Sequence, residues 1–297
     1  MAQPPKNRPF KLLTKSKYIH GLNCKKMVWL EFNAPEEIPT KTEAIQQRMD
    51  EGIKIELLAK SGFSNAMNAS DDDFATSLEK SKKYALERKT IFEGAFVSDF
   101  LYARADVLVP SGADEWDIVE IKSGTSIKED TFHDVSFQKY VYELAGLKIR
   151  KCFVMHLNNQ YVLSSSLDIE SLFVKTDITE NLDASSDVKR NIEEIMAIVA
   201  LDKAPEHSPG EYYCDDKYQV HETDEFYKKH PKFDIFDLYY AKGVAIELFH
   251  EGIFEIADIP EHRLFKKQHF IQQKTHKSGA HYLAHKELDI FISELKY

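Results

Sequence analysis

The sequence predicts an α/β domain over residues 1–204 and a smaller helical region over residues 205–297. Three observations lead to this prediction. Between Phe92 and Leu163, short apolar runs separated by turn-forming residues surround one helical pattern, as expected for strands and a helix that share a core. Helical patterns stand on both sides of that segment. The stretch Pro205–Gly210, which holds two prolines, then marks a boundary before a mainly helical remainder.

Helices are expected before the central segment. In the segment Thr14–Phe32, Ser16 is placed to cap a short helix whose aromatic and aliphatic residues can dock onto a core. Thr40 and Glu43 have the spacing of a capping box, which predicts a helix that ends at Gly62.

The central segment is expected to open with a β-hairpin. An acidic loop, Ser64–Asp73, and a polar helix over Phe74–Arg88 come before it. Ala103–Val109 is apolar except at two positions, and the turn-rich Pro110–Glu115 connects it to a second apolar run, Trp116–Lys122. Two such runs joined by a short turn predict paired antiparallel strands.

One helix and two strands are expected after the hairpin. Apolar residues recur at helical spacing over Asp134–Leu144, and Gly146 is placed to end that helix. Strands are predicted at Cys152–Leu157 and Tyr161–Leu163, followed by a helix that the serines at 185 and 186 can cap and that runs to Leu201.

The remainder of the chain is predicted to be helical. A helix over Phe236–His250 leads into a turn over Gly252–Pro260, and a last amphipathic helix begins near Lys286.

Three of the charged residues that interrupt the apolar hairpin are candidates for a common site. Asp106 lies in the first strand, and Glu120 and Lys122 lie two residues apart in the second. Side chains alternate across a strand, so Glu120 and Lys122 share a face while Val119 and Ile121 point the other way. If Asp106 faces the same side as Glu120, two carboxylates converge beside one ammonium. Alternatively, Asp106 ends a strand and the other two form an exposed pair.

Such a group has the chemistry that hydrolysis of a phosphodiester requires. Carboxylate oxygens hold a divalent cation, which stabilises charge on the phosphate and lowers the pKa of an attacking water. The backbone carbonyl of Ile121 offers one more oxygen ligand, and Lys122 can orient the water or neutralise developing charge. Isolated charges inside apolar strands need a partner or a metal, which favours this interpretation over the exposed pair.

The helix after the hairpin carries a polar pair. Gln138 and Tyr142 are four residues apart and therefore lie on one helical face. They are either a buried polar pair or a face that contacts substrate or supports a metal, and their position directly after the charged strand favours the second interpretation.

Taken together, these motifs resemble the nuclease domain of RecB and its CRISPR-associated exonuclease relatives, within the PD-(D/E)XK superfamily. The core motifs are Arg104–Asp106, Glu120–Ser123 and Gln138–Tyr142, in this order. Flanking segments extend the resemblance over roughly Leu13 to Leu201: Leu13–Leu30, Phe92–Phe96 and His156–Asn158 with Tyr161.

The resemblance implies a central mixed β-sheet flanked by helices, and a deoxyribonuclease that uses Mg²⁺ or Mn²⁺. It implies Asp106 and Glu120 as metal ligands, Lys122 as the catalytic lysine, and Gln138 and Tyr142 as a supporting motif. Relatives often carry a histidine ligand on the first core helix, where this sequence offers Glu56 instead, so Glu56 and Glu93 are further candidate ligands.

The resemblance also bears on cofactors and partners. DNA, single-stranded in some relatives, is the expected substrate, and a helicase or a further exonuclease domain is the expected protein partner. Relatives often bind an iron–sulfur cluster through four cysteines, but only Cys24 and Cys214 have suitable positions, so such a cluster is not expected. His207 and His221 flank Cys214, which leaves a mixed Cys/His site as an alternative.

Composition narrows the class of protein. The 49 acidic residues outnumber the 39 basic ones, and a formal charge of −10 counts against a protein that coats nucleic acid without specificity. Local basic runs such as Lys266–Lys267 are either substrate-binding patches or solvated faces. The longest apolar stretch, Ile195–Leu201, is far too short to span a bilayer, and with three scattered cysteines this favours a soluble cytoplasmic protein without a membrane partner.

Three functions therefore stand: an active DNA nuclease, a catalytically inactive nuclease fold that binds nucleic acid or protein, and an enzyme with another phosphate or metal chemistry. The complete set of motifs favours the first function, whereas net charge slightly favours the second. The sequence lacks the phosphate-binding loop of ATP-driven enzymes, so helicase action would require a partner.

Overall fold

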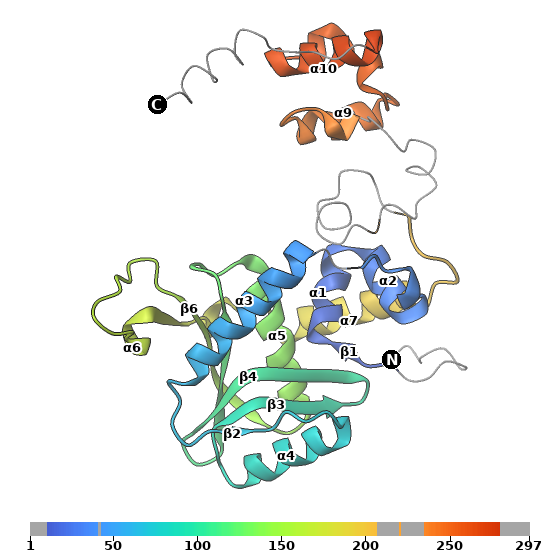
Figure 1. Cartoon of the computed structure of the whole chain (residues 1–297). Coiled ribbons are helices and arrows are strands. Elements are labelled where there is room, and N and C mark those ends of the chain that lie inside the picture. The colour runs from blue at the N-terminus through green and yellow to red at the C-terminus, as the bar shows by residue number, and fades with distance from the viewer. Residues whose placement is uncertain (1–10, 41–42, 207–219, 221–234, 280–297) are drawn as a thin grey trace. The chain divides into compact units, whose positions relative to one another are not determined.

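The computed structural model of the chain describes residues 11–40, 43–206, 220 and 235–279 (Figure 1). The chain divides into two compact units, Met1–Pro205 and Glu206–Tyr297. None of the described helices combines the length and the apolar character that crossing a membrane requires.

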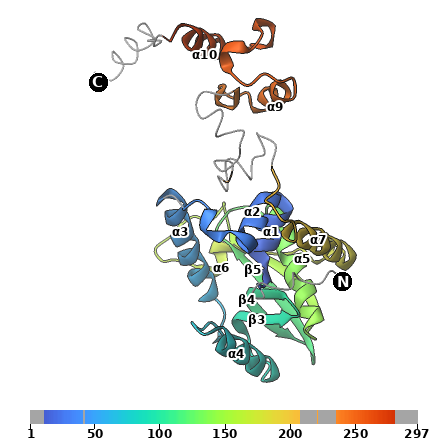
Figure 2. The ribbon, with the colours of Figure 1, turned by 90° about the vertical axis from the view of Figure 1, so that its right-hand side faces the viewer.

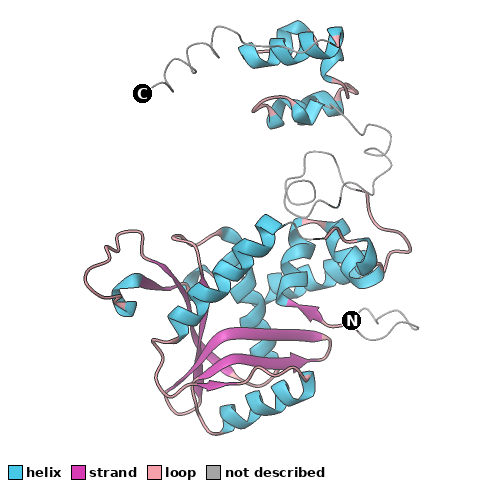
Figure 3. Ribbon diagram, viewed as in Figure 1, coloured by secondary structure: helices cyan, strands magenta, loops and turns pink. Residues whose placement is uncertain are grey.

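The first unit is built on one seven-stranded mixed sheet (Figure 3). Its main path runs in the order β2 (Met67–Asn68), β3 (Ile91–Ser98), β4 (Leu101–Ser111), β5 (Glu115–Lys122), β6 (Lys148–Leu157) and β7 (Phe173–Asp177), and β1 (Leu13–Thr14) pairs with β4. The pairs β3–β4, β4–β5 and β6–β7 are antiparallel, whereas β2–β3, β5–β6 and β1–β4 are parallel. The expected hairpin is therefore confirmed as β4 and β5.

Helices cover both faces of the sheet, so the unit is an α/β fold with a mixed central sheet (Figure 2). One apolar cluster joins the sheet to residues of α1, α2, α5 and α7, and a second joins the other face to α3 and α6. The bounds are α1 (Lys15–Asn23), α2 (Lys25–Asn33), η1 (Pro35–Glu37), α3 (Glu43–Lys60), α4 (Phe74–Leu86), α5 (Glu129–Leu144), α6 (Ile169–Leu172), η2 (Thr179–Asn181) and α7 (Ser185–Val199).

The second unit has a small apolar core of its own. Its described elements are η5 (Ile235–Asp237), α9 (Lys242–His250), η6 (Ile256–Asp258), η7 (Glu261–Arg263) and α10 (Lys267–Ser278). Leu238, Ala245, Leu248, Ile256 and Ile259 are all buried in one cluster. The predicted helix over Phe236–His250 is thus shorter than expected, α10 was not predicted, and the helix expected near Lys286 lies outside the described residues.

Several predicted elements of the first unit were wrong in detail. The cap of α1 is Thr14, which accepts a hydrogen bond from the backbone N–H of Lys17, and not Ser16. The segment expected to be an acidic loop contains β2. No strand forms at Tyr161–Leu163, where the side chains of Val162 and Leu163 are mostly exposed. The edge strand is β7 instead, which pairs with β6 alone.

The helix after the hairpin begins earlier than expected. It starts at Glu129 instead of Asp134, and Glu129 and Asp130 occupy its first turn. Acidic residues are favourable there because the amino end of a helix carries partial positive charge. The helix connects the parallel strands β5 and β6 and packs against the sheet, so its buried face lies against the strands that carry Asp106 and Glu120.

Candidate metal centre

Asp106 occupies the point where strands β4 and β5 separate. The paired residues of this ladder run from Ser111↔Glu115 to Val107↔Val119 and stop there. One residue further, Asp106 Oδ2 accepts a hydrogen bond of 2.7 Å from the backbone N–H of Ile121. The carboxylate thus takes the place of a strand carbonyl, which fixes the side chain at the open end of the hairpin.

The alternation of side chains along β4 changes at the same point. Ala105 and Leu108 belong to the cluster that faces α5, whereas Val107 belongs to the cluster that faces α3. A regular strand cannot put residues three apart on one face, so the backbone is irregular around Asp106. The neighbouring strand is irregular at the same level, because Glu93, opposite Asp106 in register, has a φ of 55° in the left-handed region.

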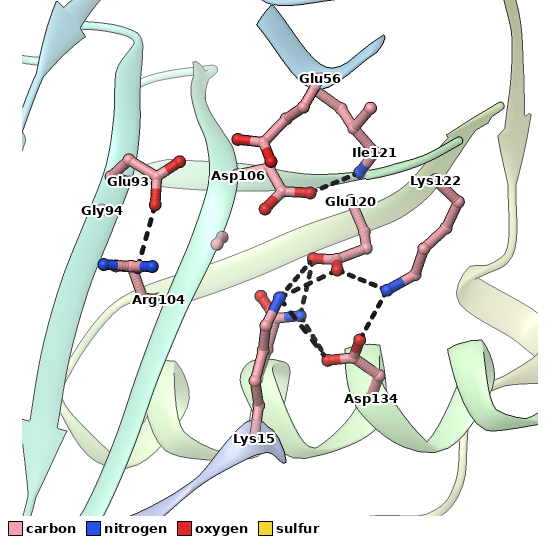
Figure 4. A network of polar contacts seen from close by, with 12 residues as sticks. Lys15, Glu56, Glu93, Gly94, Arg104, Asp106, Glu120, Ile121, Lys122 and Asp134 are labelled. Carbon is pink, nitrogen blue, oxygen red and sulfur yellow. Dashed lines mark hydrogen bonds and ion pairs between the residues drawn. The ribbon is translucent and has the colours of Figure 1, made fainter. Parts of the chain in front are cut away.

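Three carboxylates from three elements converge at this irregularity. Glu56 of α3, Glu93 of β3 and Asp106 of β4 each offer an oxygen within 4.8 Å of the others, and we call these residues the acidic cluster (Figure 4). Lys60 donates to Glu56 at 2.5 Å and also to Glu93. Arg104 Nε lies 2.9 Å from the other oxygen of Glu93. Two cations therefore face three carboxylates.

The charge on Asp106 is the least compensated in the cluster. Burial and the nearby charge of Glu120 raise the pKa of Asp106 to about 7, although Lys15 and the N–H of Ile121 oppose that rise. A carboxyl with such a pKa holds a proton readily near neutral pH, and a cation bound beside it would favour the ionised form instead.

Glu120 lies on the opposite side of the irregularity in a pocket rich in donors. It is only 2% exposed, and it accepts hydrogen bonds from Lys15 at 2.9 Å, Lys122 at 2.7 Å and Gln138 at 2.9 Å. We call Glu120 and these three donors the glutamate pocket (Figure 4). Burial alone would raise the pKa of Glu120, but Lys122 and Lys15 outweigh burial and hold the pKa well below its usual range.

Helix α5 supplies a second carboxylate to this side. Asp134 accepts from Lys122 Nζ at 2.8 Å and from Gln138 Nε2 at 2.9 Å. Burial lowers the pKa of Lys122, but Glu120 and Asp134 outweigh that effect and raise it. Lys122 therefore remains an ammonium at neutral pH. Among the described residues, Gln138 Oε1 is buried without a hydrogen-bond partner.

Tyr142 has a different surrounding from Gln138. Its hydroxyl accepts from the backbone N–H of Ala105 at 2.6 Å and donates to the carbonyl of Gly94 at 2.8 Å, so it joins β4 to β3. Both Gln138 and Tyr142 have no exposed surface. Direct contact of this pair with substrate does not fit its burial, because Gln138 bonds Glu120 and Tyr142 bonds the strands. Its role in supporting a metal site stays a prediction.

The structure places the predicted site residues in two neighbouring sets of contacts, and Asp106 lies close enough to Glu120 for their charges to interact. Asp106 joins Glu56 and Glu93, whereas Glu120 joins Lys122 and Gln138. Ile121 connects the groups through its N–H, and its carbonyl as a metal ligand stays a prediction. Val119 and Ile121 lie in the apolar cluster on the α3 face, as the alternation predicted.

Sequence reasoning missed three members of the site: Lys15, Lys60 and Asp134. Two of them had a local signal, because Lys60 stands four residues after Glu56 and Asp134 four residues before Gln138, each on one helical face. Lys15 had none, since it is 105 residues away from Glu120 along the chain.

The acidic cluster opens onto a cavity of about 700 Å³. Its lining includes cations, aromatic rings and polar side chains beside the three carboxylates: Lys15, Lys60, Arg104, Phe63, Phe92, Asn68 and Ser70. A chamber with positive and aromatic walls next to an anionic cluster is suited to a substrate that is itself an anion with flat rings.

The predicted cysteine and histidine positions contribute little to this centre. Cys24 is buried between α1 and α2 and is disulfide-bonded, so it does not offer a free thiolate, and Cys152 is buried in β6. Burial raises the pKa of the Cys152 thiol to about 12. The other candidate ligands, His207, Cys214 and His221, lie outside the described residues.

Comparisons with known proteins add little to this geometry. No protein-family model and no curated protein matches the sequence. Among solved structures, the crystal structure of SSO0001 is similar with a TM-score of 0.40 at 12% identity, over 72% of this chain and 85% of that one. Similarity at this level carries no argument about chemistry.

Proposed function

We propose that the chain is a metal-dependent nuclease of the PD-(D/E)XK type that hydrolyses phosphodiester bonds of DNA. The convergence of Glu56, Glu93 and Asp106 beside a cavity with cationic and aromatic walls carries this proposal. Carboxylate oxygens are the donors that Mg²⁺ and Mn²⁺ favour in proteins. The mixed sheet flanked by helices is compatible with that superfamily.

The acidic cluster fits a divalent cation in charge as well as in donor type. Its two cationic neighbours leave the charge of Asp106 poorly compensated, so the pKa of that carboxyl is raised to about 7. When bound there, Mg²⁺ or Mn²⁺ would stabilise negative charge on the phosphate and lower the pKa of the attacking water. Glu120 as an additional ligand stays a prediction.

The protein's own cations have separate roles in this proposal. Lys122 keeps its proton at neutral pH, so it acts by neutralising charge and not as a general base. Arg104 is half-exposed and pairs through Nε with Glu93, so its guanidinium can also approach a phosphate in the cavity. Lys15 lines the cavity and holds Glu120 at the same time.

The sequence resemblance supports DNA as the substrate and exonuclease-like action, with single strands as one form of substrate. A helicase or a further exonuclease domain as partner and a cytoplasmic location belong to the same proposal. None of these features is required by the geometry of the acidic cluster itself.

One observation favours a second function, a catalytically inactive nuclease fold that serves as a binding scaffold. Lys60 bridges Glu56 and Glu93, and Lys15 bonds both oxygens of Glu120, so protein ammonium groups occupy positions near the carboxylates. In a scaffold these lysines replace the metal permanently. In an enzyme, a bound metal ion would displace these ammonium groups.

Cleavage of labelled nucleic acid tests the proposal directly. The purified full chain is incubated with end-labelled single- and double-stranded DNA and RNA in Mg²⁺, Mn²⁺ or EDTA. We expect cleavage of DNA that EDTA abolishes, and a loss of at least about a hundredfold in Asp106→Asn, because one charged ligand is removed without loss of core volume.

The matched control is Asp114→Asn, a change at the exposed turn of the same hairpin. It should cut at the wild-type rate. Undiminished cleavage by Asp106→Asn would show that the acidic cluster is not the active site, and a wild-type chain that binds Mn²⁺ but cuts no substrate would favour the scaffold.

A further inference from the structure

The second unit exposes aromatic rings that a small core would normally bury. Tyr239 is 45% exposed, Tyr240 80%, Phe265 58% and Phe270 46%. We call these four residues the aromatic surface. Tyr239 and Tyr240 precede α9, whereas Phe265 and Phe270 lie just before and within α10 (Figure 1). Two segments of the unit therefore contribute to this surface.

Lys266 connects these segments. Its ammonium lies 5.7 Å from the ring centre of Tyr239, 5.4 Å from that of Tyr240 and 5.6 Å from that of Phe265. It also donates a hydrogen bond of 3.0 Å to the carbonyl of Tyr240. The ammonium of this half-buried lysine thus lies among three aromatic rings.

The backbone at Tyr240 is held in an unfavourable conformation. Its φ is 46°, a left-handed value that bulky residues rarely adopt. Helix α10 fixes the turn, because His269 Nε2 lies 2.7 Å from the carbonyl of Tyr239 and Gln272 Oε1 accepts from the N–H of Tyr239 at 2.9 Å. Strained residues that several bonds hold in place cluster at functional sites. Here the strained backbone holds the side chain of Tyr240 exposed to solvent.

The charge of α10 differs from that of the chain as a whole. The segment 266–278 holds four lysines and no acidic residue, in a chain of net charge −10. Lys266, Phe270, Lys274 and Lys277 follow at spacings of four, four and three, which puts them on one helical face. One aromatic ring, that of Phe270, therefore lies between lysines along one side of the helix.

We propose that the aromatic surface and the lysines of α10 bind single-stranded nucleic acid. Bases stack on the exposed rings, and the phosphates between them lie near the lysines, which is the general pattern of sequence-tolerant single-strand binding. A duplex hides its base faces, so it would use the lysines alone. An apolar protein partner would leave Lys266 without a counter-charge. The proposal does not depend on the metal centre.

Fluorescence anisotropy of the full chain tests this site in EDTA, where no cleavage interferes. The probe is fluorescein-labelled oligo(dT) of about 16 nucleotides, near the upper range of known single-strand sites. Tyr240→Phe should bind as the wild type does, because the ring remains. Tyr240→Leu and Phe270→Leu should each weaken binding by about tenfold, because a stacking face is lost while apolar volume is kept.

Two controls separate stacking from general effects. Phe74→Leu removes an exposed ring of α4 and should leave binding unchanged. Lys274→Glu should lower both the affinity and its dependence on salt, whereas Lys189→Glu on the exposed side of α7 should change neither. Circular dichroism of each variant confirms its fold.

The proposal is overturned if Tyr240→Leu and Phe270→Leu bind oligo(dT) as tightly as the wild type. It is equally overturned if an unlabelled duplex competes as well as an unlabelled single strand does. It is also overturned if the wild type does not bind oligo(dT) and binds phospholipid vesicles or an apolar peptide instead. Loss of binding in these variants with intact cleavage in Mg²⁺ would support this surface separately from the metal centre.

Discussion

Two groups of carboxylates lie on either side of the irregular point at Asp106, and they differ in how their charge is compensated. In the glutamate pocket one carboxylate, Glu120, receives hydrogen bonds from Lys15, Lys122 and Gln138. In the acidic cluster three carboxylates face Lys60 and Arg104. With Asp134 included, two lysines balance two carboxylates on the Glu120 side, whereas three carboxylates face two cations in the acidic cluster.

The difference appears in the direction of the pKa shifts. Burial disfavours the ionised form of both Asp106 and Glu120, yet the pKa of Asp106 is raised and that of Glu120 is lowered. Neighbouring charges therefore decide the outcome where burial is similar. The fold already supplies Glu120 with donors that favour its ionised form, whereas a cation bound beside Asp106 would favour the ionised form of that carboxyl.

The largest expected effect follows from removing the satisfied anion. Glu120→Ala leaves Lys15 and Lys122 as partly buried like charges, so we expect a loss of about 2–4 kcal/mol in the free energy of unfolding. Urea denaturation measures it. Glu115→Ala, at the other end of β5, removes a pair with the exposed Lys148 and should cost less than about 1 kcal/mol. Equal costs for the two variants would mean that Glu120 stabilises the fold no more than an exposed ion pair does.

The stability gained on metal binding is the second measurement that compares the two groups. At a Mg²⁺ or Mn²⁺ concentration a hundredfold above the dissociation constant, the wild type should gain about 2.7 kcal/mol over the EDTA-treated chain. Asp106→Asn and Glu93→Gln should lose this gain, whereas Asp114→Asn keeps it. Glu120→Gln should lose less of it than Asp106→Asn. The same gain in every variant would mean that the ion binds outside the acidic cluster.

Much of the first unit could be predicted from the sequence because its signals are local. The hairpin, the alternation of Val119, Glu120 and Ile121, and the helical spacing of Gln138 and Tyr142 all depend on neighbouring residues. The convergence of Asp106 and Glu120 depends on two strands together. Their charges do interact, but a metal ion shared by the two stays a prediction. The sequence did not predict the irregular backbone at Asp106, where Glu56 and Glu93 also gather.

The reason is the left-handed conformation of Glu93. A glycine at such a position would have indicated an irregular strand, but a glutamate gives no such signal. The same limit applies to Lys15, whose contact with Glu120 requires the packing of α1 on the sheet. Edge strand β7 was missed for a related reason, because a strand that pairs on one side only needs little apolar patterning.

The contribution of Asp106 to the free energy of unfolding should be smaller and should depend on pH. The folded pKa of Asp106 is about 7, above its ordinary value of 3.8, so the unfolded chain ionises this carboxyl first. Its contribution to stability is therefore lost as the pH rises between these values. Without metal, Asp106→Asn should be more stable than the wild type by about 1–3 kcal/mol at pH 8, and by little at pH 4. Thermal unfolding in EDTA at several pH values measures the difference, and a constant difference would contradict it.

The smallest effect concerns the strands next to the acidic cluster. Tyr142→Phe removes one hydroxyl that serves Ala105 and Gly94, leaving a buried N–H and a buried carbonyl without that partner, so we expect a loss of about 1–2 kcal/mol. Tyr140→Phe, two residues along the same helix and only partly buried, should change stability by less than about 0.5 kcal/mol. Because the hydroxyl of Tyr142 bonds only backbone groups, the folded variant should still gain stability from Mg²⁺. If Tyr142→Phe abolished that gain while remaining folded, the strand joint at Gly94 and Ala105 would itself be needed to hold Glu93 and Asp106 in place.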